Sequence, residues 1–266
     1  MKFSSIAFSC VLLTSYASAA PRGHSTLEER IARRAGRATR PLQRIEESVA
    51  GDNETQVSYS SNWSGAVLTS PPSGETFNEV TASFVVPTPK VPSGSSSSGS
   101  YSASAWVGID GDTYQNAILQ TGVDFTIDNG KVSYDAWYEW YPDYAYDFSI
   151  AISEGDTITA TVSSTSTTAG TAVIENVTTG KKVTKSLTSS SALGGQNAEW
   201  IVEDFEEGSS LVALVNWGTV TFTGATAKAG SSSVTPAGAE IIDIEQNSKV
   251  LTSVSVSGTT VTDTYV

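Results

Sequence analysis

The sequence predicts an all-β protein, an antiparallel two-sheet β-sandwich of the jelly-roll or lectin-like kind, and three observations support this fold class. From Ser58 onward, about fourteen short runs rich in Val, Ile, Thr and aromatic residues are separated by Gly, Pro or Ser/Thr clusters. No amphipathic helical pattern of about ten residues or more occurs there. The central runs alternate apolar and polar residues, which suits strands with one buried face. Such a number of strands in roughly 210 residues indicates one sandwich domain.

Residues 1–19 are predicted to be a secretory signal peptide, so we expect the protein to be secreted and extracellular. Met1 and Lys2 precede an apolar stretch, and Ala17-Ser18-Ala19 offers small residues before a cut. This stretch and every later run fall short of the roughly 20 apolar residues of a membrane-spanning helix, and we expect no membrane contact. The only cysteine, Cys10, lies in this signal, which predicts a mature protein without disulfides.

Residues 20–54 differ sharply in charge from the rest of the chain. All seven arginines lie between Arg22 and Arg44, whereas from Gln56 onward 7 lysines face 22 acids, a formal charge of −15. A basic segment directly before an acidic domain is suited to electrostatic docking. We therefore predict that residues 20–54 are a removable pro-segment acting as an intramolecular inhibitor, with a solvated linker as the alternative, and that residues 55–266 are the mature domain. The negative charge also argues against nucleic-acid binding, and we expect a monomer.

The candidate strands follow one another along the chain with turn signals between them. They are residues 62–68, 79–87, three runs within 104–141, 148–152, 157–163, 171–177, 182–187, 198–205, 211–215, 220–227, 239–245, 249–257 and 259–266. Residues 92–100, PSGSSSSGS, are predicted to form a flexible surface loop because serine and glycine cannot anchor a core.

Residues 104–141 contain three runs in which each strand has one apolar face and one chemically mixed face. The turn sequence Asp128-Asn129-Gly130 predicts a hairpin between the second and third runs, because asparagine and glycine tolerate positive φ. If the three runs pair in one sheet, their mixed faces form a groove of aromatic, acidic and amide side chains. These faces carry Trp106, Gly108 and Asp110, then Ile118, Gln120, Gly122 and Asp124, then Ser133, Asp135, Trp137, Glu139 and Tyr141.

The residue types exclude several kinds of catalytic site. The sole histidine, His24, precedes the domain and the sole cysteine lies in the signal, so histidine- or thiolate-based triads and the usual zinc sites are excluded. Asp110-Gly111-Asp112 resembles part of a calcium loop, but the glycine spacing and closing glutamate of an EF-hand are missing. We expect no metal and no cofactor.

Residues 198–207 contain a second group of acids. Trp200 and Val202 mark one strand face as core, which places Glu199, Ile201 and Glu203 on the other. A carboxylate among bulky apolar side chains is the type whose pKa can be tuned, whereas a solvated strand residue is the plainer interpretation.

Several sequence blocks together resemble the eqolisins, the fungal glutamic peptidases. The blocks are Ser-Asn-Trp-Ser-Gly-Ala at 61–66, Trp-Val-Gly-Ile-Asp-Gly-Asp-Thr at 106–113, Ala-Ile-Leu-Gln-Thr-Gly at 117–122, Tyr-Asp-Ala-Trp-Tyr-Glu-Trp-Tyr-Pro at 134–142 and Glu-Asp-Phe-Glu-Glu at 203–207. The resemblance runs from about residue 58 to the C-terminal strand. It implies a secreted, pepstatin-insensitive acid endopeptidase with a pro-segment, built as two seven-stranded sheets and acting on protein or peptide substrates.

The resemblance also implies roles for individual residues. The family's catalytic glutamine and glutamate fall on Gln120 and Glu203. Positions that line or support the substrate cleft fall on Trp63, Trp106, Asp110, Asp124, Trp137, Glu139 and Tyr141. Some members carry disulfides where this chain has Tyr114 and Asp263, a departure that leaves the catalytic assignment intact.

These two side chains can carry out peptide hydrolysis. Ionised Glu203 would take a proton from a water that Gln120 holds, and the carboxamide N–H would stabilise the oxyanion. Two other classes remain open from the residues alone. An aromatic and acidic groove also suits a carbohydrate-binding module or glycoside hydrolase, and a structural cell-wall protein would have no activity. Of the sequons at Asn53, Asn62 and Asn176, Asn176 is the predicted glycosylation site.

Overall fold

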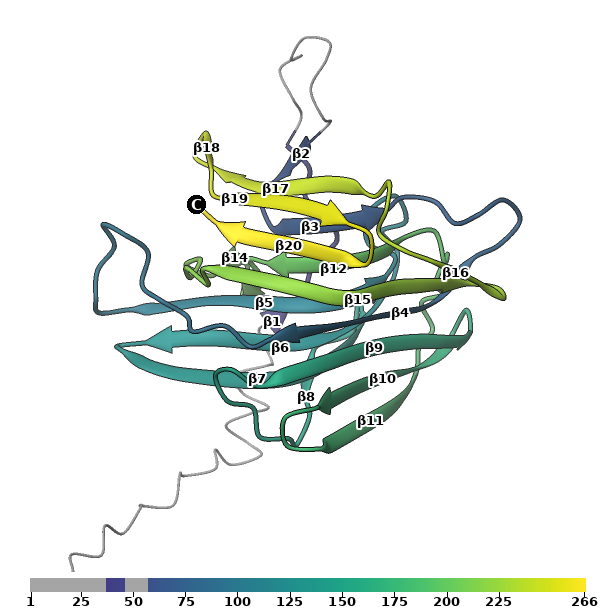
Figure 1. Cartoon of the computed structure of the whole chain (residues 1–266), viewed down its shortest axis with the longest axis horizontal. Helices are drawn as coiled ribbons and strands as arrows, with labels where there is room; N and C mark the ends of the chain where they lie inside the picture. Colours follow the sequence, from purple (N-terminus) through teal and green to yellow (C-terminus); the bar gives the residue numbers. More distant parts are fainter. Residues whose placement is uncertain (1–36, 46–56) are drawn as a thin grey trace, which may run out of the picture.

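The computed structural model describes residues 37–45 and 57–266, and this part of the chain consists of strands, turns and irregular segments without a helix. Two large sheets, one of eight and one of nine strands, lie face to face (Figure 1), and a third sheet has three short strands. The predicted two-sheet sandwich is therefore confirmed. The predicted signal peptide and the boundary between residues 54 and 55 lie outside the described residues.

The strand order is not the sequence order in either large sheet. The eight-stranded sheet has the order β11 (Lys181–Thr188), β10 (Ala169–Asn176), β9 (Thr157–Ser166), β4 (Phe77–Val85), β15 (Thr219–Ala229), β20 (Thr260–Tyr265), β19 (Thr252–Ser257), with β16 (Ser232–Val234) on β15. The nine-stranded sheet has the order β18 (Lys249–Val250), β17 (Glu240–Gln246), β3 (Trp63–Leu68), β12 (Ala198–Glu203), β5 (Ser100–Ile109), β6 (Ile118–Asp128), β7 (Lys131–Tyr141), β8 (Tyr146–Asp147), with β2 (Val57–Ser60) on β17. The small sheet joins β1 (Arg37–Ala38), β13 (Glu206–Glu207) and β14 (Ser210–Leu211). Without β8, β16 and β18, each of two or three residues, both large sheets have seven strands.

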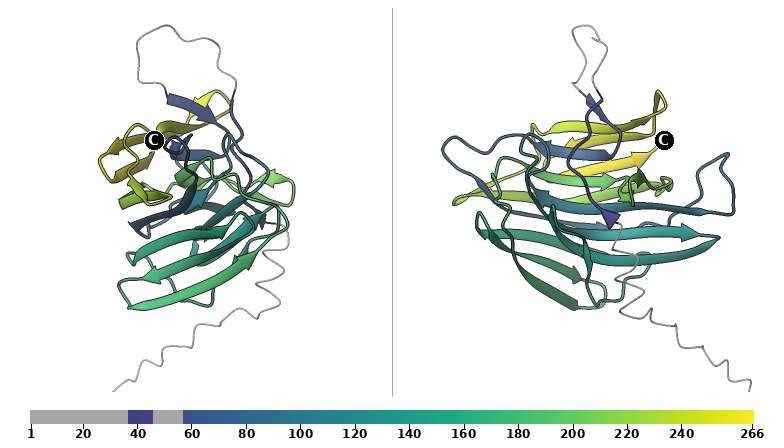
Figure 2. Two further views of the ribbon diagram at one scale, coloured as in Figure 1. Left: turned by 90° about the vertical axis from the view of Figure 1, so that its right-hand side faces the viewer. Right: turned by 180° about the vertical axis from the view of Figure 1, so that it is seen from behind.

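The main core fills the space between the two large sheets, as the alternating pattern predicts. Val107, Phe125 and Trp200 are fully buried there. A second apolar cluster lies on the opposite face of the nine-stranded sheet and includes Trp106 and Ile201. This second cluster is buried because the segment 37–45 crosses that face, as seen from behind in Figure 2.

The hairpin between β6 and β7 forms as predicted. Asn129 and Gly130 are the two turn residues, with φ of 47° and 78°. Positive φ at both positions is typical of the type I′ turn, whose twist matches that of antiparallel strands. The turn fixes the register of the hairpin, which places Gln120 opposite Glu139.

Two predicted strands are wrong. Residues 148–152 form no strand, because Phe148, Ile150 and Ile152 pack singly against the core as the chain leaves β8. Of 211–215 only Leu211 belongs to a strand, and Leu214 makes an isolated bridge to Ser102. In both segments the apolar side chains pack against the core, but the backbone does not form the regular hydrogen-bond ladder of a strand. One pairing, β2 with β17, is parallel.

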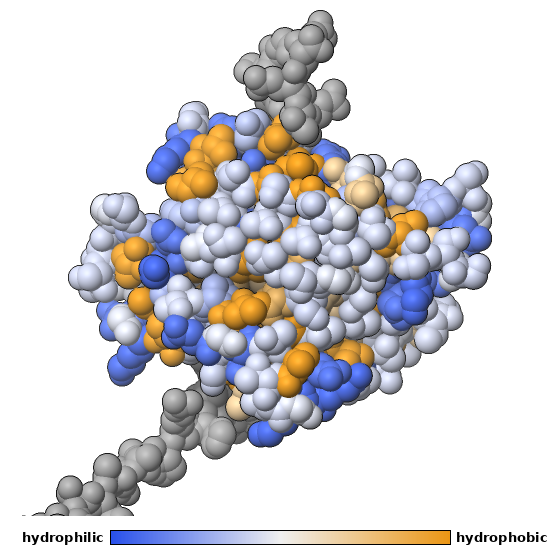
Figure 3. Space-filling model, viewed as in Figure 1, coloured by the Kyte–Doolittle hydropathy of each residue, from blue (hydrophilic) through white to orange (hydrophobic). Residues whose placement is uncertain are grey.

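The outer face of the eight-stranded sheet is covered mainly by residues of intermediate hydropathy (Figure 3). Thr81 and Thr161 exchange a 2.7 Å hydroxyl hydrogen bond across β4 and β9, and Ser83 and Thr159 do the same. Within residues 37–45 and 57–266, no helix is long and apolar enough to cross a membrane.

Candidate active site

Strand register gathers the predicted site residues on the face of the nine-stranded sheet that points away from the main core. Three rows cross β3, β12, β5, β6 and β7 in order, because residues paired across antiparallel strands project to the same side. The rows are Val67, Glu199, Gly108, Gln120 and Glu139; then Gly65, Ile201, Trp106, Gly122 and Trp137; then Trp63, Glu203, Ser104, Asp124 and Asp135. Gln120 and Glu203 therefore reach the same face from strands on either side of β5.

Glu203 is fully buried in this site and is held by hydrogen bonds on both carboxylate oxygens. The Trp106 indole N–H donates to Oε2 at 3.0 Å, and the backbone N–H of Arg40 donates to Oε1 at 3.3 Å. Burial raises the pKa of Glu203 well above its ordinary value, and the charge of Glu139 raises it further, while Arg37 and the two donors lower it. The site thus contains a carboxyl group with a tuned pKa, not the solvated strand residue of the plainer interpretation.

Gln120 is also fully buried and lies between Gly108 and Glu139 in its row. Neither its Oε1 nor its Nε2 atom forms a hydrogen bond with the described residues. A buried carboxamide normally has partners for its acceptor oxygen and its two donor hydrogens. Both ends of this side chain are thus available to a water or a substrate.

The N-terminal segment, residues 37–45, runs through the site as an extended peptide. The backbone N–H of Thr39 donates to Glu139 at 3.4 Å, and the carbonyl oxygen of Arg40 accepts the Trp63 indole N–H at 3.0 Å. Leu42 is buried and joins the same apolar cluster as Trp63. The predicted site residues Trp63, Glu139 and Glu203 therefore contact the main chain of a peptide along its length.

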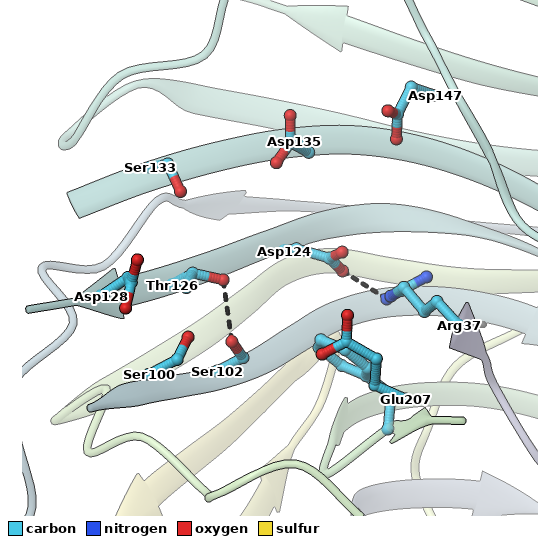
Figure 4. Close-up of a pocket in the computed structure, with 11 residues that line it drawn as sticks. Arg37, Ser100, Ser102, Asp124, Thr126, Asp128, Ser133, Asp135, Asp147 and Glu207 are labelled. Atoms are coloured by element: carbon cyan, nitrogen blue, oxygen red, sulfur yellow. Dashed lines mark hydrogen bonds and ion pairs between the residues drawn. The ribbon is translucent and has the colours of Figure 1, made fainter. Parts of the chain in front are cut away.

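Arginines attach this segment to acidic side chains. Arg37 forms an ion pair with Asp124, and its guanidinium lies 4.6 Å from the ring centre of Trp137 and 4.1 Å from that of Phe205. The pocket around Arg37 is strongly acidic (Figure 4). Its lining includes Asp124, Asp128, Asp135, Asp147 and Glu207.

Farther along the segment, two more arginines form ion pairs. Arg40 pairs with Glu206 at 2.9 Å, and Glu206 together with Tyr141 raises the pKa of Arg40. Arg44 pairs with Asp112 at 2.7 Å and also with Glu240. The electrostatic docking expected from the charge contrast is thus visible in named pairs.

Most predicted cleft residues contact the N-terminal segment, but Asp110 does not act as a direct contact. Its buried carboxylate accepts backbone N–H groups from residues 194–197, with distances of 2.8 Å to Gly194 and 2.7 Å to Gln196. Asp110 therefore anchors the loop that enters β12. Trp106 likewise supports Glu203 through its indole N–H.

The predicted glycan at Asn176 conflicts with the structure. Asn176 is fully buried, and its Nδ2 atom donates to Asp156 at 2.7 Å and to the carbonyl oxygen of Ala151 at 3.3 Å. A glycan on this nitrogen would displace both bonds. Asn62 is equally buried and accepts the backbone N–H of Gln43 at 2.9 Å.

Sequence reasoning did not assign roles to Phe205, Glu206 and Asn62, which contact the N-terminal segment. Phe205 and Glu206 follow Glu203 in a block that the family resemblance includes, and that proximity was the available signal. Among the described residues, no group of three or more His, Cys, Asp or Glu side chains is arranged to hold a metal ion.

Comparisons with known proteins place this chain in a peptidase family. The Peptidase A4 family profile matches residues 61–265. Aspergillopepsin-2 of Aspergillus niger is 48% identical over 291 aligned residues, and scytalidopepsin B of Scytalidium lignicola is 42% identical over 280, each alignment covering all of both chains.

Solved structures of glutamic peptidases are also similar to this chain. Scytalido-glutamic peptidase with a transition-state analog inhibitor is similar with a TM-score of 0.69 and 46% identity, covering 77% of this chain and 98% of that one. Aspergilloglutamic peptidase from Aspergillus niger gives a TM-score of 0.61 and 61% identity, covering 62% of this chain and 99% of that one.

Proposed function

Because this chain belongs to the Peptidase A4 family and is a glutamic endopeptidase, we propose that Glu203 and Gln120 are its catalytic pair. The pair serves a secreted, pepstatin-insensitive endopeptidase that works in acid. The observation that carries the proposal is the peptide backbone in the site, whose Arg40 nitrogen lies 3.3 Å from Glu203 Oε1. Family membership leaves no support for the carbohydrate-binding, glycoside hydrolase or structural alternatives.

The first chemical step needs a base and an oxyanion donor. Ionised Glu203 removes a proton from a water while the water oxygen attacks the carbonyl carbon of the substrate. The Gln120 carboxamide holds the water through Oε1 and donates an Nε2 hydrogen to the carbonyl oxygen as it gains negative charge. Glutamine suits this role because its N–H donors are present at every pH.

The second step returns the proton. Glu203, now protonated, donates to the nitrogen of the tetrahedral intermediate, and the C–N bond breaks to give a carboxylic acid and an amine. The placement of the Arg40 nitrogen beside Glu203 Oε1 supports this transfer, because a substrate nitrogen in that position lies within reach of the protonated carboxyl. The Trp106 indole N–H fixes the other oxygen, so the carboxyl group keeps its orientation.

Substitution of each member of the pair tests the proposal. Gln120→Ala and Glu203→Gln should fold normally and lose turnover by a factor of about 10³ or more, measured with a quenched fluorescent peptide at acid pH in the presence of pepstatin. Glu206→Gln in the mature domain is the matched control and should stay active, because it removes a nearby carboxylate outside the pair. Near-normal activity in Gln120→Ala or Glu203→Gln would show that the pair is wrongly assigned.

We further propose that residues 20–54 are a pro-segment and that residues 37–45 within it inhibit the enzyme by occupying the substrate site. The main-chain contacts to Glu139, Glu203 and Trp63 support this role. The ion pairs of Arg37, Arg40 and Arg44 support it too, since they attach this basic segment to acidic side chains around the site. Burial raises the pKa of Asp112, so the ion pair between Asp112 and Arg44 weakens as the pH falls.

A further inference from the structure

A second glutamate lies in the same row as Gln120. Glu199, on β12, is fully buried, and neither carboxyl oxygen forms a hydrogen bond with the described residues. Only Gly108 separates Glu199 from Gln120 in the row, and Gln120 is likewise buried without a hydrogen-bonding partner among those residues. Four polar side-chain atoms thus share one buried region of the site. Such atoms are rarely left unbonded in a native protein.

Gly108 explains how the carboxyl group of Glu199 reaches toward Gln120. A Cβ atom at Gly108 would lie 2.7 Å from Glu199 Oε1 and 2.7 Å from the Trp106 ring carbon Cζ3. The Glu199 carboxyl and the edge of the Trp106 indole therefore occupy the space above β5 that a side chain would fill. From there, the next strand of the row is about 4.8 Å away. Two polar groups bridged by one water are about 5 Å apart, because each hydrogen bond spans about 2.8 Å.

We propose that Glu199 is a positioning residue that orients the Gln120 carboxamide through one bridging water. The proposal rests on the catalytic function assigned to Gln120 above. It gives the unbonded atoms of Glu199 and Gln120 a common partner. It also places Glu199 beside Trp106 over Gly108. The space left by this one glycine therefore holds both the residue that orients Gln120 and the residue that orients Glu203.

Orientation matters for Gln120 because the two ends of a carboxamide have nearly the same shape and opposite hydrogen-bonding roles. The mechanism needs Oε1 toward the water and Nε2 toward the substrate carbonyl, and a flipped group would present each to the wrong partner. Burial, followed by the charges of Asp110 and Asp112, raises the pKa of Glu199 well above its ordinary value. In acid, Glu199 is therefore a neutral group that can both donate and accept, as a bridge to a carboxamide requires.

The test compares two substitutions of similar size in the mature domain. Glu199→Leu removes the hydrogen-bonding capacity and should lower kcat by about 10- to 100-fold, the usual effect of losing a supporting polar contact, with KM little changed. Glu199→Gln keeps a neutral donor and acceptor and should hold kcat within about threefold. Because Glu199→Gln cannot ionise, the decline of kcat at the upper end of the active pH range should also move to higher pH. Melting temperatures confirm that each variant is folded at the assay pH.

The control is Asp263→Asn, which alters another fully buried carboxyl group. Asp263 lies on β20 of the other sheet, so kcat should be unchanged. The proposal is overturned if Glu199→Leu keeps kcat within twofold or raises only KM. It is also overturned if Glu199→Gln lowers kcat as much as Glu199→Leu does. If Glu199→Leu does not fold, an unmoved upper pH limb in Glu199→Gln overturns it. An active Gln120→Ala would instead refute the catalytic pair.

Discussion

Asp204→Asn is expected to make the stability of the domain less sensitive to pH. Asp204 directly follows the proposed base and is 1% exposed. Its Oδ2 atom accepts a hydrogen bond from Gln246 Nε2 at 2.7 Å. Burial raises the pKa of Asp204 from 3.8 to about 7, with the Gln246 bond opposing the shift. The folded protein therefore holds a proton on Asp204 over a pH range in which the unfolded chain has released it.

The sign and size of the effect follow from this difference. A raised folded-state pKa contributes stability that is fully present below about pH 3.8 and is lost as the pH rises toward 7. A shift of about three pKa units corresponds to about 4 kcal/mol, of which about 2 kcal/mol is lost between pH 4 and pH 6. Folded domains are stable by about 5–15 kcal/mol. Ionisation of this one buried aspartate thus changes the free energy of unfolding by a large part of its total.

Urea unfolding of the mature domain at pH 4 and pH 6 measures this pH-dependent contribution of Asp204 to the free energy of unfolding. Both proteins carry Glu203→Gln to prevent self-digestion, and one also carries Asp204→Asn. Between pH 4 and pH 6, the free energy of unfolding should fall by about 2 kcal/mol less in the protein that carries Asp204→Asn than in the one that does not. Glu175→Gln, which removes a partly exposed carboxylate paired with Lys182, is the control and should leave the pH dependence of the unfolding free energy as it is. Equal losses with and without Asp204→Asn would refute the reasoning.

Two further predictions concern the site and its N-terminal segment. Trp106→Phe removes the N–H that lowers the pKa of Glu203, so the acid limb of kcat/KM should move to higher pH; an unmoved limb would contradict the contact. The precursor should be latent at pH 7 and convert on acidification, faster with Arg37→Ala or Arg44→Ala, as followed on gels and with a peptide substrate. The Glu203→Gln precursor, purified alone, should not convert, and conversion at the normal rate would rule out self-processing.

The sequence predicts which side chains share a face far better than which ones touch. Alternation of period two places Gln120 and Glu139 on the mixed face, and the Asn129-Gly130 turn fixes their register because the two strands are local neighbours. Nothing local fixes β12 between β3 and β5, which come from distant parts of the chain. The contact of Trp106 with Glu203 depends on that distant pairing, so the residues alone could not predict it.

Burial of polar residues is the second point at which sequence patterns fall short. The sequon at Asn176 and the Asp-Gly-Asp turn at Asp110 both have the composition of surface features. In the fold, both side chains are fully buried because each completes the backbone or side-chain hydrogen bonding of a neighbouring loop. A polar residue that satisfies buried donors has the same one-dimensional signature as one that is solvated.

If residues 37–45 inhibit the enzyme as proposed, the distribution of charge connects release of this segment with the pH at which the domain is most stable. Burial raises the pKa values of Glu199, Asp204 and Asp263, so each costs stability when it ionises. The mature part of the chain has 7 lysines and no arginine to offset its acids, whereas the N-terminal segment brings arginines to Asp112 and Asp124. Loss of that segment near neutral pH would leave Asp112 without the arginine that pairs with it. Under the proposed role of residues 37–45, acid neutralises Asp112 and so weakens the hold on the segment. This happens in the pH range where neutral Glu199, Asp204 and Asp263 stabilise the fold.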